Sequence, residues 1–197
     1  MIMSSRETIL QAVALNKPDL SDLPDIDLRL TIQYQDPINQ FVSMLEAAGG
    51  KVYYQNSGVE LLNDLAEVKA EGKFMINLLE NSGYEDWANL KAYELEALDT
   101  CYLRAEMGVA ENGAMWISEK QMSNRLLPFI CQHLVIVLSP ETIVNTMHEA
   151  YQQIDAAANG FGVFIAGPSK TADIEQNLVI GAHGARSLRV YLVGYEI

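Results

Sequence analysis

The stretch from residue 161 to residue 194 limits the folds open to this chain more than any other. It contains two apolar runs, 161–166 and 188–193, whose length and composition predict buried strands. Between these runs lie two short polar segments that contain glycine, 167–173 and 181–186. Ligands in open α/β sheets bind outside the carboxyl ends of the strands. The pattern therefore predicts an α/β sheet with a ligand site at these two segments.

The first polar segment has the composition of a strand end followed by a helix start. Gly167 permits a positive φ and Pro168 cannot continue a strand ladder, so the strand is expected to end there. Ser169 is then the N-cap of a short helix, whose free N–H groups attract an anion. Further polar side chains in this segment come from Lys170, Thr171 and Asp173. The alternative is an ordinary turn before a capped helix, and for Asp173 either an internal cap or a contact with a ligand hydroxyl.

The second polar segment brings an imidazole and a guanidinium together. His183 and Arg186 are separated by two residues and accompanied by Gly181 and Gly184, which allow a ligand to approach the backbone closely. The chain as a whole has a net charge of −13, whereas the region 160–197 contains three acidic and three basic residues. An anionic ligand is better accommodated in this neutral region than elsewhere. The alternative is a tight turn with a solvated arginine.

The segment GPSKTADIEQNLVIGAHGARSLRVYLV resembles the C-terminal signature of the LUD-domain family, of the lactate utilization protein C type. The family usually has proline where this chain has Ala185. The resemblance extends more loosely back to Asp99. It implies an α/β fold in a single domain, with a mostly parallel sheet and flanking helices, of the NagB/RpiA/CoA-transferase type.

The resemblance also implies a function, namely a part in the oxidation of L-lactate to pyruvate beside iron–sulfur partner proteins. The chain has two cysteines, Cys101 and Cys131, whereas an iron–sulfur cluster usually needs four ligands. The electron-carrying groups are therefore expected in the partners. The cofactor of this chain itself is left open.

Composition limits the classes of partner. The chain has 197 residues, enough for one α/β domain with a sizeable core, and 26 acidic residues against 13 basic ones. This balance argues against nucleic acid and against an anionic membrane surface. No apolar run is long enough for a transmembrane helix, and no signal peptide is recognisable. Two cysteines without paired spacing predict reduced thiols in the cytoplasm.

The N-terminal third predicts a short helix, an arm and the start of the domain. Residues 6–16 form an amphipathic helix, and the region 17–27, rich in proline and aspartate, is either a loop on the body or a contact with a neighbouring subunit in a homodimer. Asp36 and Pro37 begin a helix that ends at two glycines. Alternating strands and helices follow, so 1–35 is an N-terminal extension and 36–197 the domain, with the motif-bearing part at 99–197.

The region 98–117 contains two short apolar runs separated by Glu111, Asn112 and Gly113. A β-hairpin with an Asn-Gly turn is one interpretation. The other is a carboxylate and an amide presented to a ligand. LUD-family proteins usually have Asp-Thr-Gly-Thr here. The three residues resemble instead the catalytic glutamate motif of family I CoA transferases, in which a carboxylate nucleophile forms an acyl-enzyme.

The region 118–166 predicts one further ligand contact and a crossover unit. Arg125 either holds a carboxylate or phosphate bidentately or forms a surface ion pair. Residues 133–138 are a buried strand that starts at His133, which either bonds the backbone or takes part in catalysis. A long helix over 140–158 then leads to the strand at 161–166, which gives a right-handed βαβ crossover.

Together these residues predict recognition of a small anion, a carboxylate or a phosphate. In this hypothesis His183 transfers a proton, with Asp173 or Glu111 as partner or base. Arg186 and Arg125 pair with the anion, and no metal is expected. Two alternatives from other classes remain open: a CoA- or nucleotide-dependent transferase or ligase with Glu111 as nucleophile, and a non-catalytic assembly subunit.

Overall fold

The computed structural model describes residues 4–18, 21, 25–55, 57–79, 87–155, 160–172, 178–181 and 183–194. Its centre is a parallel five-stranded sheet in the order β1-β11-β6-β3-β2. The strands of this sheet are β1 (Lys51–Tyr53), β11 (Ser187–Leu192), β6 (His133–Leu138), β3 (Thr100–Arg104) and β2 (Met75–Asn77). The single α/β domain with a mostly parallel sheet and flanking helices is thus confirmed.

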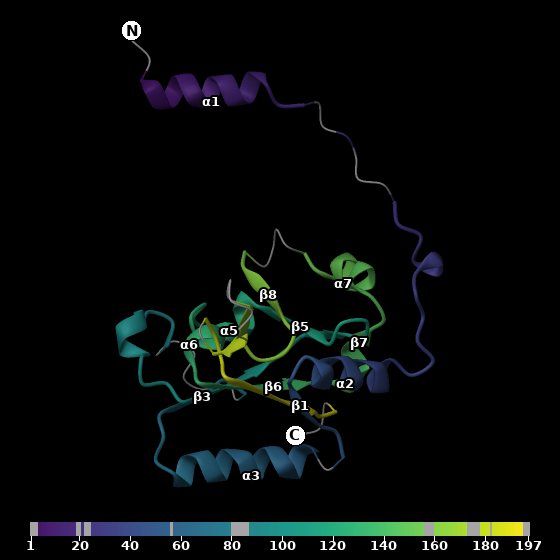
Figure 1. The fold of residues 1–197 in the computed structure, drawn as a ribbon, viewed down its shortest axis with the longest axis vertical. Helices are drawn as coiled ribbons and strands as arrows, with labels where there is room; N and C mark the ends of the chain where they lie inside the picture. Colours follow the sequence, from purple (N-terminus) through teal and green to yellow (C-terminus); the bar gives the residue numbers. More distant parts are fainter. Residues whose placement is uncertain are drawn as a thin grey trace.

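The central strand β6 is apolar on both faces, as parallel strands buried between two layers usually are. Leu134, Ile136 and Leu138 belong to the main core. Val135 and Val137 belong to a second cluster on the opposite face. Figure 1 shows how helices cover the two faces, with α2 (Pro37–Ala47) on one side and α3 (Ser57–Ala70) on the other.

Helix α2 begins where the sequence predicts. Asp36 is the N-cap and its side chain accepts a hydrogen bond from the Asn39 N–H, while Pro37 occupies the first helical position. Phe41 and Leu45 are fully buried in the main core. The predicted strands that follow α2 and α3 are confirmed as β1 and β2.

A second sheet contains the predicted hairpin. Its four strands run in the order β7-β4-β5-β8, and β5 pairs antiparallel with both β4 and β8. The strands are β4 (Met107–Val109), β5 (Ala114–Ser118), β7 (Ile143–Val144) and β8 (Gly162–Ile165). The buried strand expected at 161–166 is therefore a half-buried strand of this second sheet, and the predicted βαβ crossover from β6 is wrong.

The long helix expected over 140–158 is wrong as well. A 3-10 turn (Pro140–Thr142) and β7 occupy its first half, and among the described residues of this range only α7 (Met147–Gln153) is α-helical. The cause is a long-range contact: the Val144 carbonyl accepts the N–H of Ala110, and the Asn145 carbonyl accepts the N–H of Glu111. Pairing with β4 outweighs the helical pattern, and Thr146 then caps α7.

The remaining helices of the described residues are short or lie apart from the two sheets. They are α1 (Ser5–Leu15), α5 (Glu119–Met122), α6 (Leu127–Ile130) and the 3-10 turns Leu28–Leu30 and Ala92–Glu94. Helix α1 lies apart from the domain in Figure 1, and Ile9, Leu10 and Val13 on it are exposed. Among the described helices, none combines the length and the apolar character that crossing a membrane requires.

Candidate functional site

The structure brings the two polar segments together around one cavity of about 260 Å³. Gly167, Ser169 and Lys170 from the first segment and His183 and Gly184 from the second line it. The rest of the wall comes from Pro128, Phe129, Leu134, Val163, Phe164, Ile165, Ala185 and Leu188. We refer to this space as the motif cavity. Its lining combines a lysine, a serine and a histidine with apolar side chains.

Backbone hydrogen bonds hold the two segments in this arrangement. The Ser169 N–H donates to the Ala185 carbonyl at 2.8 Å, and the Gly181 N–H donates to the Ser169 carbonyl at 3.0 Å. Gly184 is packed so closely that a Cβ there would lie 3.1 Å from Ser169 Cβ. A side chain at 184 would therefore require Ser169 to shift by a few tenths of an ångström.

The helix expected after Ser169 is not formed. Residues Lys170–Ala172 are strand β9, which pairs antiparallel with β10 (Leu178–Ile180). The Ser169 N–H is already bonded to Ala185, so an anion at a helix start is not the arrangement present here. The backbone of Thr171 lies in β9, whereas Asp173 lies outside the described residues.

Gly167 ends β8 as predicted, with φ at +96°. A Cβ at this position would meet the carbonyl oxygen of Ala48 at 2.9 Å. The Lys170 ammonium lies beside Gly49, as a Cβ built on Gly49 would be 3.2 Å from Lys170 Nζ and 3.5 Å from Pro168 Cγ. This segment therefore packs on the C-terminal end of α2, where the helix dipole favours a cation.

The edge of the sheet on which this site lies differs from the prediction. The segment 181–186 directly precedes β11, so it lies at the amino ends of the central strands and not at their carboxyl ends. Arg186 donates its backbone N–H to the Gln132 carbonyl, and its side chain is exposed and absent from the cavity wall. Among the described residues, no ion pair involves Lys170, His183 or Arg186.

The structure places the other predicted site residues elsewhere. Glu111, Asn112 and Gly113 form the turn of the β4–β5 hairpin, in which the Asn112 side chain accepts the N–H of Ala114. Glu111 Oε1 accepts the N–H of Met147, the first residue of α7. Glu111 thus caps a helix, and none of these three residues lines the motif cavity.

Arg125 forms the surface ion pair that the sequence left open. Its Nε lies 2.7 Å from Glu119 Oε1 and its Nη2 donates to Glu119 Oε2 at 3.0 Å. The guanidinium also lies over the ring of Phe161, 5.0 Å from its centroid. With its charge and its donors so engaged, Arg125 does not extend into the motif cavity.

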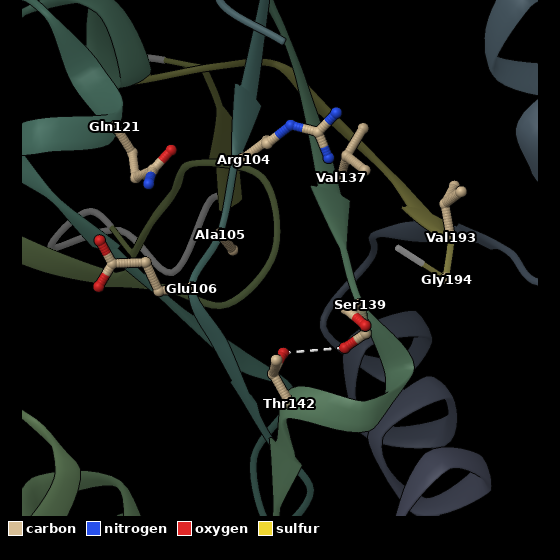
Figure 2. A pocket seen from close by; sticks show the side chains of 9 residues that line it. All are labelled: Arg104, Ala105, Glu106, Gln121, Val137, Ser139, Thr142, Val193 and Gly194. Carbon is tan, nitrogen blue, oxygen red and sulfur yellow. Dashed lines mark hydrogen bonds between the residues drawn. The ribbon is translucent and has the colours of Figure 1, made fainter. Parts of the chain in front are cut away.

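A larger cavity, of about 440 Å³, lies at the carboxyl ends of β3, β6 and β11 and was not predicted (Figure 2). We call it the carboxyl-edge cavity. Its lining residues are Arg104, Ala105, Glu106, Gln121, Val137, Ser139, Thr142, Val193 and Gly194. Arg104 and Ser139 come directly at the end of apolar strands, which is the sequence signal that marks this edge. Their proximity depends on the strand order, which the sequence does not reveal.

A polar cluster lies beneath α3, on the face of the central sheet that this helix covers. The Asp64 carboxylate lies 3.0 Å from Arg189 Nε and accepts the Tyr102 hydroxyl at 2.8 Å. Burial, and then the bond to Asp64, raises the pKa of Tyr102 well above its usual value. Among the described residues, no group of three or more histidine, cysteine or acidic side chains is arranged to hold a metal ion.

Comparisons with known proteins agree with the C-terminal resemblance. The LUD domain model matches residues 38–193. Lactate utilization protein C of Bacillus pumilus is 31% identical over 102 residues, which cover 49% of this chain and 42% of that protein. Lactate utilization protein C of Oceanobacillus iheyensis is 31% identical over 86 residues, which cover 41% of this chain and 37% of that protein. The matched region thus spans about two fifths of the length of these relatives.

A solved structure shares the fold. The crystal structure of a DUF162 family protein from Deinococcus radiodurans superposes with a TM-score of 0.57 and 17% sequence identity, over 83% of this chain and 100% of that chain. The family match itself begins in α2 and includes both sheets and both segments of the motif cavity. The chain therefore belongs to the LUD domain family.

Proposed function

We propose that this chain is a cytoplasmic subunit or accessory protein of L-lactate oxidation to pyruvate that binds a small organic carboxylate in the motif cavity. The observation that carries the proposal is the convergence of Ser169, Lys170 and His183 on one cavity. These groups come from segments separated in sequence and joined by backbone hydrogen bonds. Relatives named lactate utilization protein C support lactate or pyruvate as the carboxylate.

The chemistry of the cavity suits a three-carbon acid. Lys170 supplies a positive charge for the carboxylate, Ser169 a hydrogen-bond donor and His183 an imidazole whose ring nitrogens donate or accept a hydrogen bond. The apolar side chains of Val163, Ile165 and Leu188 face the same space and suit a methyl group. Arg186 belongs to the same polar segment as His183 and adds positive charge to it.

Electron transfer is assigned to partner proteins in this proposal. Cys101 and Cys131 are free thiols, both buried, and neither lines the motif cavity. Burial raises the pKa of the Cys101 thiol well above its usual value and that of Cys131 to about 12, which keeps both protonated and unreactive. The chain would present or sense the substrate, and iron–sulfur partners would carry the electrons.

Isothermal titration of the full chain with L-lactate and with pyruvate tests this proposal. Lys170→Gln retains the aliphatic stem beside α2. It is expected to weaken binding about tenfold or more, because a hydrogen bond from a charged group is lost. His183→Ala is expected to weaken binding as well. Lys69→Gln, at an exposed position of α3, removes the same charge far from the cavity and is the matched control. Binding that is absent in the wild type, or unchanged in both cavity variants, would overturn the proposal.

An assembly role is the second candidate, and helix α1 favours it. An isolated helix of 11 residues is marginal in water, yet the apolar side of α1 is exposed. A partner surface that covers Ile9, Leu10 and Val13 would stabilise it. The test is co-purification with iron–sulfur proteins, followed by their visible absorption. Replacement of these three residues by serine should abolish the co-purification and leave carboxylate binding in the motif cavity intact.

A further inference from the structure

The carboxyl-edge cavity lies on the opposite edge of the sheet from the motif cavity and has no part in the proposed function. It lies where β3, β6 and β11 end, and ligands of open α/β sheets bind at that edge. Its volume of about 440 Å³ is within the range of small-molecule sites, roughly 300 to 1,000 Å³, and far exceeds what a three-carbon acid fills.

Arg104 is the positively charged group of this cavity. Its side chain is exposed, its one hydrogen bond among the described residues is a long one of 3.4 Å from Nε to the Leu79 carbonyl, and it forms no ion pair there. In Figure 2 the guanidinium extends over Val137. An unpaired guanidinium on a strand end presents two parallel donors to a carboxylate or a phosphate.

Ser139 supplies the second observation. It lines the cavity, and its Oγ is buried without a hydrogen-bond partner among the described residues. A buried hydroxyl without a partner lowers the stability of a fold, so its presence calls for a reason. Rotation about χ1 is sufficient to redirect a serine hydroxyl toward a ligand. The neighbouring Thr142 hydroxyl already donates to the Ser139 carbonyl at 2.8 Å.

The other end of the cavity carries hydrogen-bonding groups of a different kind. Figure 2 shows Glu106 and Gln121 on the side of β3 away from Ser139. One oxygen of Glu106 accepts the Ser118 hydroxyl, and the other accepts no hydrogen bond from the described residues. A carboxylate and an amide side by side recognise hydroxyl groups and not a second anion.

We propose that the carboxyl-edge cavity binds an extended organic anion that carries hydroxyl groups. Arg104 holds the anionic end, and Ser139, Gln121 and Glu106 form hydrogen bonds to the hydroxyls. The cavity is thus a second ligand site, separate from the motif cavity.

Titration of the full chain with D-gluconate and with D-glucose 6-phosphate tests this assignment, with D-glucose as the neutral probe. The two anions distinguish a carboxylate from a phosphate. At least one of them is expected to bind, and D-glucose at least tenfold more weakly. Arg104→Gln is expected to weaken binding by about tenfold to a hundredfold. Arg29→Gln, which removes another exposed arginine, one that is paired with Asp27, is the control and should leave binding unchanged.

Ser139→Ala distinguishes a ligand contact from a packing role. Loss of an unpartnered buried hydroxyl should leave the urea midpoint of the free protein unchanged or higher, while binding of the anion weakens severalfold. Binding of neither anion, or binding that survives both Arg104→Gln and Ser139→Ala, would overturn the assignment. Binding that Lys170→Gln abolishes and Arg104→Gln does not would place the anion in the motif cavity, which also overturns the present inference while leaving the proposed function intact.

Discussion

His133 Nδ1 lies 2.7 Å from Ser187 Oγ, across the neighbouring parallel strands β6 and β11. The two residues are register partners at the first position of each strand, so the pair joins the amino ends of the central strand β6 and its neighbour β11. Burial is the main cause of a lowered pKa of His133, and the cations Arg189, Lys73 and Arg186 act in the same direction. Asp99 opposes them. The neutral imidazole is therefore the form that the fold favours.

The stability of the protein is expected to fall as the pH falls below about 6.5. Above that value His133 is neutral in both the folded and the unfolded chain. As the pH decreases, the unfolded chain binds the proton first, because the folded pKa is lower. His133→Gln retains a hydrogen-bonding group for Ser187. It should reduce the dependence of the free energy of unfolding on pH, by at most about 1.4 kcal/mol per pH unit. Urea unfolding of the wild type and the variant at pH 7.5, 6.5 and 5.5 measures this dependence. The same change in the free energy of unfolding with pH in both proteins would contradict the prediction.

The ion pair beneath α3 is expected to make a large contribution to folding. Asp64→Asn leaves the guanidinium of Arg189 largely buried without its counterion and weakens the bond from Tyr102. We expect a loss of about 2–3 kcal/mol in the free energy of unfolding. Glu67→Gln, an exposed position of the same helix, is the control and should change it by less than about 0.5 kcal/mol. Equal effects of the two substitutions would show that the pair is energetically unimportant.

Substitution by alanine at Gly162 and at Gly58 should change the free energy of unfolding in opposite directions. A Cβ at Gly162 would overlap the indole ring of Trp116, whereas a Cβ at Gly58 meets nothing within 4 Å. Gly162→Ala is expected to lower the free energy of unfolding by about 1–3 kcal/mol through overpacking. Gly58→Ala, within α3, is expected to raise it by up to about 1 kcal/mol. Thermal and urea unfolding of both variants measure the difference, and destabilisation by Gly58→Ala would contradict this interpretation.

Glu111→Gln distinguishes a helix cap from a nucleophile. Because Glu111 Oε1 accepts the Met147 N–H, loss of the negative charge should lower the free energy of unfolding by about 0.5–1 kcal/mol. Carboxylate binding in the motif cavity should remain unchanged. A variant of unchanged stability that loses a CoA-transfer activity of the wild type would instead support the acyl-enzyme hypothesis.

The parts of the fold that the sequence predicts are those that local chemistry determines. Asp36 and Pro37 mark the start of α2, and the apolar run 133–138 marks β6. The Asn112-Gly113 turn marks the hairpin, where Gly113 adopts φ at +69° and a Cβ would lie 2.7 Å from the backbone nitrogen of Leu45. In each case a short stretch of neighbouring residues carries the signal that the sequence analysis used.

The errors arise where a distant segment decides the outcome. Ile143 and Val144 fit the apolar stripe of a helix, yet they form a strand. They pair with β4 of the hairpin, which lies more than thirty residues away in the sequence, and backbone hydrogen bonds join the two segments. Lys170–Ala172 forms a strand because β10 pairs with it. The sequence did identify the segments of the motif cavity, but their position at the amino edge and the cavity at Arg104 and Ser139 follow from the strand order alone.

The place of β11 in the sheet has a consequence for how the protein is made. This strand follows every other described strand in the chain, yet it lies between β1 and β6. While residues 187–192 are still inside the ribosome, the nascent chain lacks the strand that joins β1 to β6. The sheet therefore closes only after synthesis of nearly the whole domain, and its edges stay open to chaperones until then.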